Sequence, residues 1–203
     1  MIAIIDYGAG NIQSVMNAFE KIGAKATLVS DADKLKSYDK LILPGVGAFS
    51  EAMQRLKSAN LDEAIKDFVA SSKPFLGICL GMQLLFDQSD EFGFSAGLGL
   101  ISGKVVKFQN DKFITPLKVP HVGWNTVNFK KQTAINKGLK DSEYFYFVHS
   151  FHAVCEDDVV LGVSKYGYNF ISAVAKDNVF GFQPHPEKSH DTGLKILKNF
   201  KEL

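Results

Sequence analysis

Cysteine, net charge and long apolar runs are all scarce in this sequence. Only Cys79 and Cys155 occur among 203 residues, with no CxxC pair, which excludes a disulfide framework and favours a reducing, cytoplasmic location. No run of about 18 apolar residues exists, so the sequence predicts no membrane-spanning helix. The 23 basic and 22 acidic residues almost cancel, and this balance gives no indication of a nucleic-acid or membrane partner.

Targeting signals and common cofactor motifs are missing as well. The N-terminal run MIAIID lacks a basic flank and is cut short by Asp6, so we expect no secretory signal. Gly8-Ala9-Gly10 is followed by Gln13 where a dinucleotide fingerprint requires glycine, and no P-loop occurs. The histidine spacings match no HExxH or zinc-finger pattern. We therefore predict no metal site and no cofactor.

The part of the chain up to about residue 92 alternates short apolar runs with amphipathic segments. Its composition, 46% hydrophobic and 22% charged, is typical of a soluble globular protein. Strands are predicted at 1–6, 26–30, 40–45 and 74–79, and helices at 12–22, 49–56, 61–69 and 80–86. This alternation is typical of βαβ units around a parallel sheet.

Beyond residue 92 the pattern changes to Val-, Phe- and Tyr-rich runs separated by short turns such as Lys176-Asp177-Asn178. These runs predict antiparallel hairpins packed on the first sheet, and residues 191–203 predict a closing helix. We found no repeat or linker. The predicted fold is therefore a single α/β domain over residues 1–203, with a central, mostly parallel sheet flanked by helices and an additional antiparallel sheet.

The segment Gly77-Ile78-Cys79-Leu80-Gly81 lies at a predicted strand-to-helix junction and fits the G-x-S-x-G nucleophile template with Cys in place of Ser. Glycines at both ends avoid Cβ clashes in the sharp turn. The following helix N-terminus favours a thiolate, and the Leu80 N–H is placed to stabilise an oxyanion. A buried structural cysteine at a tight turn is the alternative.

The segment Gln183-Pro184-His185-Pro186-Glu187 follows a predicted strand. A thiol nucleophile needs a base, and the base needs a carboxylate to orient it, which His185 and Glu187 can supply. The alternative is a polar turn stiffened by two prolines.

Pro44-Gly45-Val46-Gly47 ends the third predicted strand. Because ligands bind beyond the carboxyl ends of parallel strands, this segment can offer a second oxyanion donor beside Leu80, although a plain βα turn is equally compatible. Cys155 is interpreted as a packed small apolar residue.

Together these motifs resemble the class I glutamine amidotransferases, which use a Cys-His-Glu triad. GICLGMQLLF and HPE are shared across that class. The segments GAGN, PGVGAF and PHVGWN are more similar to the glutaminase subunits of imidazole glycerol phosphate synthases, of histidine biosynthesis. The resemblance extends over essentially the whole chain.

The resemblance implies roles for individual residues. Cys79 would be the nucleophile, His185 the general base and acid, and Glu187 the orienting carboxylate. The Val46 and Leu80 amides would form the oxyanion hole. The positions that match the glutamine-binding set are Gly47, Gln83, Glu91, Ser150 and Phe151, and those that match the partner-facing surface are Asn11 and Trp124. Relatives often carry Tyr at position 151, so Phe151 is a departure unless the contact there is made by backbone.

The resemblance also implies a reaction and a partner. Cys79 would attack the carboxamide of L-glutamine, releasing ammonia and then glutamate. The site uses residues from the whole chain, so the acceptor reaction must belong to another chain, which in this family is a (β/α)8-barrel cyclase forming a heterodimer. We expect the Pro44–Gly47 segment to present its donor only when the loaded partner is bound.

Three other interpretations stay open at this point. The same glutaminase chemistry could supply ammonia to a sugar-modifying synthetase. Cys79 could instead serve a hydrolase or peptidase without an ammonia acceptor. Finally, the chain could be a non-enzymatic interaction subunit with a structural cysteine, in which case Cys79→Ala would have no effect.

Overall fold

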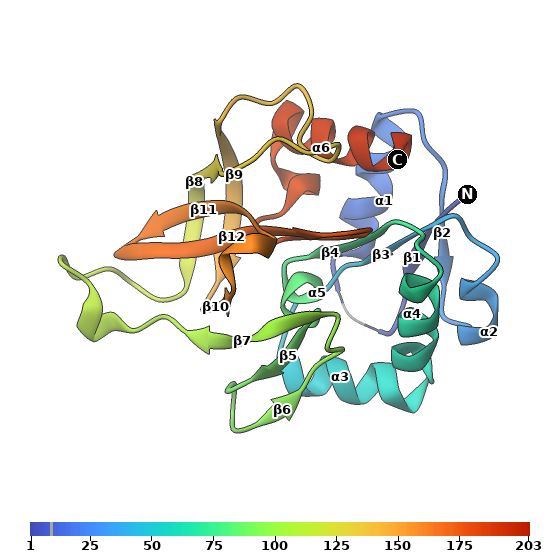
Figure 1. Ribbon diagram of the computed structural model, residues 1–203, viewed down its shortest axis with the longest axis horizontal. Coiled ribbons are helices and arrows are strands. Elements are labelled where there is room, and N and C mark those ends of the chain that lie inside the picture. Colours follow the sequence, from blue (N-terminus) through green and yellow to red (C-terminus); the bar gives the residue numbers. More distant parts are fainter. Residues whose placement is uncertain (9) are drawn as a thin grey trace.

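The computed structural model describes residues 1–8 and 10–203, and it places a mixed β-sheet between two layers of helices (Figure 1). The helices are α1 (Ile12–Lys21), α2 (Ala32–Leu35), α3 (Phe49–Ser58), α4 (Leu61–Ala70), α5 (Leu80–Gln83) and α6 (His190–Glu202). The strands are β1 (Ile2–Ile5), β2 (Ala26–Val29), β3 (Lys40–Leu43), β4 (Phe75–Ile78), β5 (Phe86–Ser89), β6 (Ser95–Ala96), β7 (Ile101–Lys107), β8 (His121–Phe129), β9 (Ser142–His149), β10 (Phe151–Cys155), β11 (Val160–Tyr166), β12 (Tyr168–Lys176) and β13 (Val179–Phe182).

The parallel half of the sheet has the strand order β2-β1-β3-β4-β13. All residues of β1, β4 and β13 are buried, because helices cover both faces of the sheet there. Consequently the ends of β3, β4 and β13 meet at one edge, and the segments that follow these strands lie close together.

The antiparallel half continues the same sheet. A hairpin through Asp177, whose φ is 51°, joins β12 to β13. From β12 one branch runs through β10, β7, β5 and β6, and the other through β11, β8 and β9. The α/β fold predicted from the sequence is confirmed, with the refinement that the antiparallel strands are hydrogen-bonded into the main sheet instead of lying on it.

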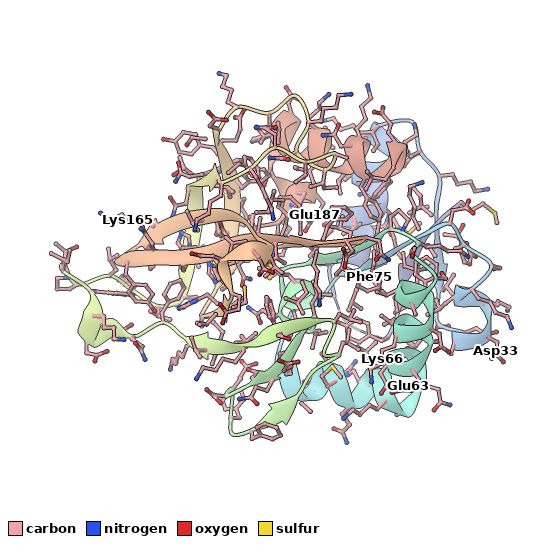
Figure 2. All side chains as sticks on the ribbon, in the orientation of Figure 1. Asp33, Glu63, Lys66, Phe75, Lys165 and Glu187 are labelled. Carbon is pink, nitrogen blue, oxygen red and sulfur yellow. The ribbon has the colours of Figure 1, made fainter. Side chains whose placement is uncertain are left out.

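Two hydrophobic cores hold the layers together. On one face, α3 and α4 bury Met53, Leu56 and Ile65 against the sheet; on the other, α1 and α6 bury Phe19 and Phe200 (Figure 1). The polar sides of the helices face solvent, as the labelled Glu63–Lys66 pair on α4 shows in Figure 2. No helix in the described parts of the chain is long and apolar enough to cross a bilayer.

The segment after Cys79 differs from the helix predicted at 80–86. Helix α5 ends at Gln83, and Phe86 begins β5, which pairs in parallel with β7. The buried apolar residues 84–86 therefore lead into strand β5. Hydrophobic periodicity alone does not distinguish such a short buried run from a buried helix. In the run YFYFVHSF the chain leaves β9 after His149 and enters β10 at Phe151, so Ser150 lies at a break between two strands.

Candidate active site

The turn that carries Cys79 has a strained backbone that only small neighbours allow. Cys79 lies between β4 and α5 with φ 54° and ψ −111°, outside the conformations that most residues adopt. A Cβ atom on Gly77 would lie 2.6 Å from the Gly81 carbonyl oxygen, and one on Gly81 would lie 1.7 Å from the Leu43 carbonyl oxygen. Both glycines are thus required by close backbone approach, as the sequence predicted.

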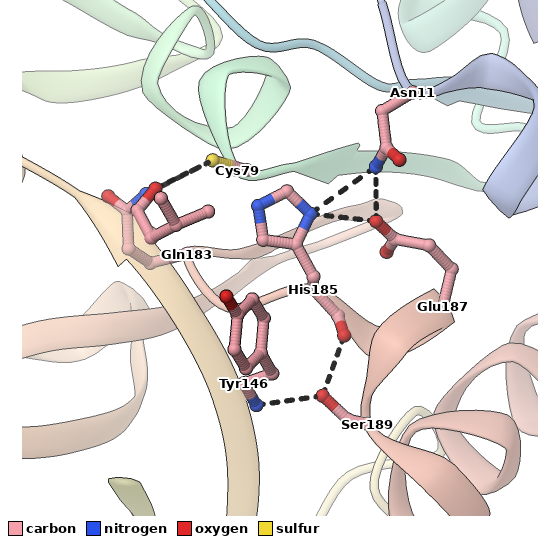
Figure 3. Close-up of polar contacts among 8 residues, drawn as sticks. Asn11, Cys79, Tyr146, Gln183, His185, Glu187 and Ser189 are labelled. Atoms are coloured by element: carbon pink, nitrogen blue, oxygen red, sulfur yellow. Dashed lines mark hydrogen bonds and ion pairs between the residues drawn. The ribbon is translucent and has the colours of Figure 1, made fainter. Parts of the chain in front are cut away.

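The pairing of β13 with β4 brings the second motif to Cys79. Phe182 is in register with Ile78, and the Cys79 N–H donates to the Phe182 carbonyl at 2.8 Å. His185 then follows within three residues, and its Nδ1 lies 2.7 Å from Glu187 Oε1, with both side chains inaccessible to solvent. In Figure 3 the imidazole ring lies between Cys79 on one side and Glu187 on the other.

The charges around His185 favour its protonated form. Burial on its own lowers the pKa of His185, but the proximity of Cys79 and the hydrogen-bonded carboxylate of Glu187 outweigh this effect and raise the pKa from 6.5 to about 10. In the described part of the chain, His185 Nε2 is a buried atom without a hydrogen-bond partner, and so is Glu187 Oε2. The Nδ1–H is held by Glu187, which leaves Nε2 as the position that exchanges a proton.

Two further side chains support this cluster. Asn11, at the start of α1, donates its Nδ2 hydrogen bond to Glu187 Oε1, and the same nitrogen lies 3.4 Å from His185 Nδ1 (Figure 3). Gln183 lies on the other side, with Nε2 3.8 Å from Cys79 Sγ. The contact of Asn11 with Glu187 was not expected from the sequence, because the two residues are separated by most of the chain.

A cavity of about 430 Å³ opens beside the sulfur of Cys79. It is lined by both predicted oxyanion-hole residues and by all five predicted glutamine-binding residues: Val46, Leu80, Gly47, Gln83, Glu91, Ser150 and Phe151. Phe92, Lys107, Val148 and His149 complete the lining, and the sequence analysis assigned no role to them. Cys79 itself lines the cavity, whereas His185 is fully buried and is not part of the lining.

Hydrogen bonds fix the wall of this cavity. Gln83 donates from Nε2 to the Phe151 carbonyl at 3.1 Å and to Gln183 Oε1 at 3.0 Å. Both amide hydrogens of Gln83 are therefore used, so toward a ligand this side chain can only accept a hydrogen bond. Phe151 contributes to the wall through its backbone carbonyl, and the missing tyrosine hydroxyl does not affect this contact.

The cavity carries one acidic and one basic side chain. Glu91 accepts a hydrogen bond at Oε2 from the backbone N–H of Phe49, 2.7 Å away, and thereby caps the N-terminus of α3. Among the residues that the structure describes, Glu91 Oε1 has no hydrogen-bond partner, and Lys107 lines the same cavity. An acid and a base in one cavity match the ammonium and carboxylate groups of an amino acid.

Trp124 lies outside this cavity, on β8. It is 47% exposed and stacks on His190 with the rings 4.9 Å apart and nearly parallel. The neighbouring Val122 on β8 and Tyr144 on β9 are also exposed. Together they form an exposed apolar surface, and such surfaces on soluble proteins commonly mark sites of interaction with a partner.

Cys155 and a metal site are the remaining candidates. Cys155 is half-buried against the core, and burial together with nearby acidic residues raises its pKa to about 11, so its thiol stays protonated. Within residues 1–8 and 10–203, no cluster of three or more His, Cys, Asp or Glu side chains that could hold a metal ion is present.

Comparison with known proteins agrees with this arrangement. Residues 3–203 match the family described as glutamine amidotransferase class-I. The imidazole glycerol phosphate synthase subunit HisH of Sulfurimonas denitrificans is 60% identical over 201 residues, covering 98% of this chain and 97% of the relative. The HisH subunit of Wolinella succinogenes is 53% identical over the full length of both chains. Among solved structures, PurLQS from Thermotoga maritima has a TM-score of 0.77 at 23% identity, covering 99% of this chain and 97% of that one, which shows a shared fold.

Proposed function

The chain belongs to the glutamine amidotransferase class-I family, and on that premise we propose that it is the glutaminase subunit of an imidazole glycerol phosphate synthase, acting in histidine biosynthesis in the cytoplasm. It hydrolyses L-glutamine to glutamate and ammonia. The observation that carries the proposal is the position of Cys79, which lies at the cavity in a strained turn with the buried His185–Glu187 pair behind it.

In the first half of the reaction, the Cys79 thiolate attacks the carboxamide carbon of glutamine. The carbonyl electrons move onto oxygen, where the Leu80 and Val46 amides stabilise the negative charge. The protonated His185 then gives its Nε2 proton to the nitrogen that leaves, so ammonia departs and a glutamyl thioester remains on Cys79. The raised pKa of His185 supports this step, because the ring carries the required proton at neutral pH.

In the second half, water cleaves the thioester. Neutral His185 takes a proton from water at Nε2, and the resulting hydroxide attacks the thioester carbonyl at the same oxyanion hole. Collapse of the intermediate releases glutamate and restores the thiolate beside the protonated imidazole. Glu187 holds the Nδ1–H in place throughout, with Asn11 fixing the carboxylate.

Glutamine is held at its amino-acid end by the far side of the cavity. The Gln83 carbonyl and the free Glu91 oxygen accept hydrogen bonds from the α-ammonium group, and Lys107 attracts the α-carboxylate. Backbone at Gly47, Ser150 and Phe151 completes the contacts. This arrangement selects the free amino acid against a peptide-linked glutamine, which lacks both charges.

Ammonia passes to a partner chain, which we take to be a (β/α)8-barrel cyclase bound as a heterodimer. The cyclase uses the ammonia to form imidazole glycerol phosphate and an aminoimidazole carboxamide ribotide. The exposed Val122, Trp124 and Tyr144 surface provides apolar anchors for such a partner, since exposed aromatic side chains often dominate binding energy.

The partner also controls turnover through the Pro44–Gly47 segment. Val46 is 41% exposed, and Gly47 has a φ of 110° that glycine adopts without strain, so this segment can reorient its peptide groups when a partner covers it. Docking of the loaded cyclase would then fix the Val46 N–H at the oxyanion position.

The test compares glutamine hydrolysis by the chain alone, with the cyclase, and with the cyclase plus its nucleotide substrate, using Cys79→Ala as the matched inactive control. We expect turnover that depends on Cys79 and rises in each step. Equal rates in all three would refute the control by the partner. Turnover of other amides, coupling only to a sugar-modifying synthetase, or indifference to Cys79→Ala would support the alternative interpretations instead.

A further inference from the structure

Two buried histidines outside the His185–Glu187 pair face each other across strands β8 and β9. His121 and His149 are in register, and His121 Nδ1 lies 3.0 Å from His149 Nε2. Both residues are buried, and His121 stacks between the rings of Phe147 and Tyr166. Burying two imidazole rings in an aromatic cluster costs free energy unless their nitrogens are hydrogen-bonded, so the partners of these nitrogens are informative.

The hydrogen bonds of this pair have only one consistent direction. His149 Nδ1 lies 2.7 Å from the Phe151 carbonyl, which can only accept, so Nδ1 carries the proton and Nε2 is an acceptor. His121 Nδ1 must then donate to His149, and His121 Nε2 accepts from Asn125 Nδ2 at 3.3 Å. Every ring nitrogen is used, which leaves neither ring free to act as a base.

A second proton on either ring would break this chain. If His149 Nε2 or His121 Nε2 were protonated, that nitrogen would be a donor facing another donor. Consistent with this, burial lowers the pKa of His149 to about 3 and that of His121 to about 4. Both rings are therefore neutral at physiological pH, and both carry their hydrogen on Nδ1.

The chain ends at the cavity wall. The Phe151 carbonyl that accepts from His149 also accepts from Gln83, so two donors fix its position. It lies at the break between β9 and β10, where the Ser150 backbone turns away from the regular ladder, and the Ser150 carbonyl accepts from the Phe108 N–H at 3.0 Å. His149, Ser150 and Phe151 all line the cavity that contains Cys79.

We propose that His121 and His149 are positioning residues, which, as a neutral hydrogen-bonded pair, hold the Ser150–Phe151 wall in the conformation that receives glutamine. The inference rests on the proposed function for the identity of the ligand. His121 makes no contact with the cavity and acts only through His149 and Phe151. The pair therefore affects how well the substrate is bound, and the reacting groups at Cys79 and His185 are not part of it.

The test replaces His121 in two ways. His121→Phe keeps a ring that can stack between Phe147 and Tyr166 but removes the donor to His149, whereas His121→Asn keeps a donor near the position of Nδ1. With the cyclase bound, we expect His121→Phe to raise the KM for glutamine about tenfold while kcat changes less than about twofold. The substitution leaves the buried His149 Nε2 acceptor unpaired, and the lost hydrogen bond should weaken glutamine binding by about that factor. His121→Asn should recover most of the loss. An unchanged KM in His121→Phe, or equal damage from both variants, would overturn the inference.

A measurement without turnover separates this inference from the proposed function. Imidazole ¹⁵N spectra of the wild-type chain should show the Nδ1–H tautomer at His121 and His149, and both rings should remain neutral at pH 5.5. An Nε2–H tautomer at either residue, or titration near pH 6.5, would refute the pair. If the spectra agree but the wild-type complex hydrolyses no glutamine, it is the proposed function that fails.

Discussion

Replacing Gly81 with alanine tests how strictly the turn around Cys79 is determined. A Cβ atom there would lie 1.7 Å from the Leu43 carbonyl oxygen and 2.7 Å from its carbonyl carbon. Ordinary contact begins at about 3.4 Å, so backbone must move by more than an ångström. The moving atoms belong either to β3, which is held between β1 and β4, or to the first turn of α5. Neither can retreat without breaking sheet or helix hydrogen bonds.

We therefore expect Gly81→Ala to lower the free energy of unfolding by about 3 kcal/mol or more, at the upper end of the cost of overpacking. A shift of about 1 Å at Cys79 would also reduce glutamine turnover roughly 100-fold. Urea denaturation and initial rates of glutamate release with the cyclase bound measure the two effects.

Gly23→Ala is the matched control. Its φ of 65° is also positive, but no atom lies within 4 Å of the added Cβ, so only backbone strain of about 1 kcal/mol is expected, with no change in turnover. If Gly81→Ala had the stability and activity of the wild type, the interpretation of the turn would be wrong.

Three further predictions follow from the site and its surroundings. Glu187→Gln removes a charge that raises the pKa of His185; turnover should fall about 100-fold to 10,000-fold, with little change in KM, and the upper limb of the pH–rate profile should shift to lower pH. His121 and His149 resist protonation down to about pH 4 and 3, whereas the unfolded chain binds these protons near pH 6.5, so the contribution of these two rings to stability in urea should decline as the pH falls below 6.5; the raised pKa of His185 acts in the opposite sense and only above that pH, and a flat profile between pH 7 and 4.5 would contradict the pKa shifts of His121 and His149. Trp124→Ala should weaken cyclase binding about 10-fold or more by calorimetry, whereas substitution of the exposed Asp33 on α2, at the opposite edge of the molecule (Figure 2), should not.

Local features of the site were predictable from the sequence because neighbouring residues determine them. Gly77 and Gly81 around Cys79 indicate a tight turn with no room for side chains at those two positions. The predicted strand before Gln183 indicates that His185 lies just beyond the end of a strand. The order of strands and helices up to residue 79 follows from the same kind of pattern, and the observed fold confirms it apart from the short helix α2, which was not predicted.

Features that depend on long-range packing were not predictable. Asn11 reaches Glu187 only because α1 and α6 pack on the same face of the sheet, and no pattern in the sequence connects them. The pairing of His121 with His149 depends on the register of β8 and β9. The break at Ser150 is equally hidden, because a run of alternating aromatic residues continues on both sides of it.

The place of β13 next to β4 has a consequence for how this protein matures. Cys79 is synthesised early in translation. His185 and Glu187 emerge from the ribosome only near the end, after β13, the strand that inserts between β4 and β12. On the proposed mechanism, a nascent chain on the ribosome would lack the base for Cys79, and a product truncated before β13 would not hydrolyse glutamine. Glutaminase activity would then arise only when synthesis is almost finished, and incomplete copies would not consume the glutamine of the cell.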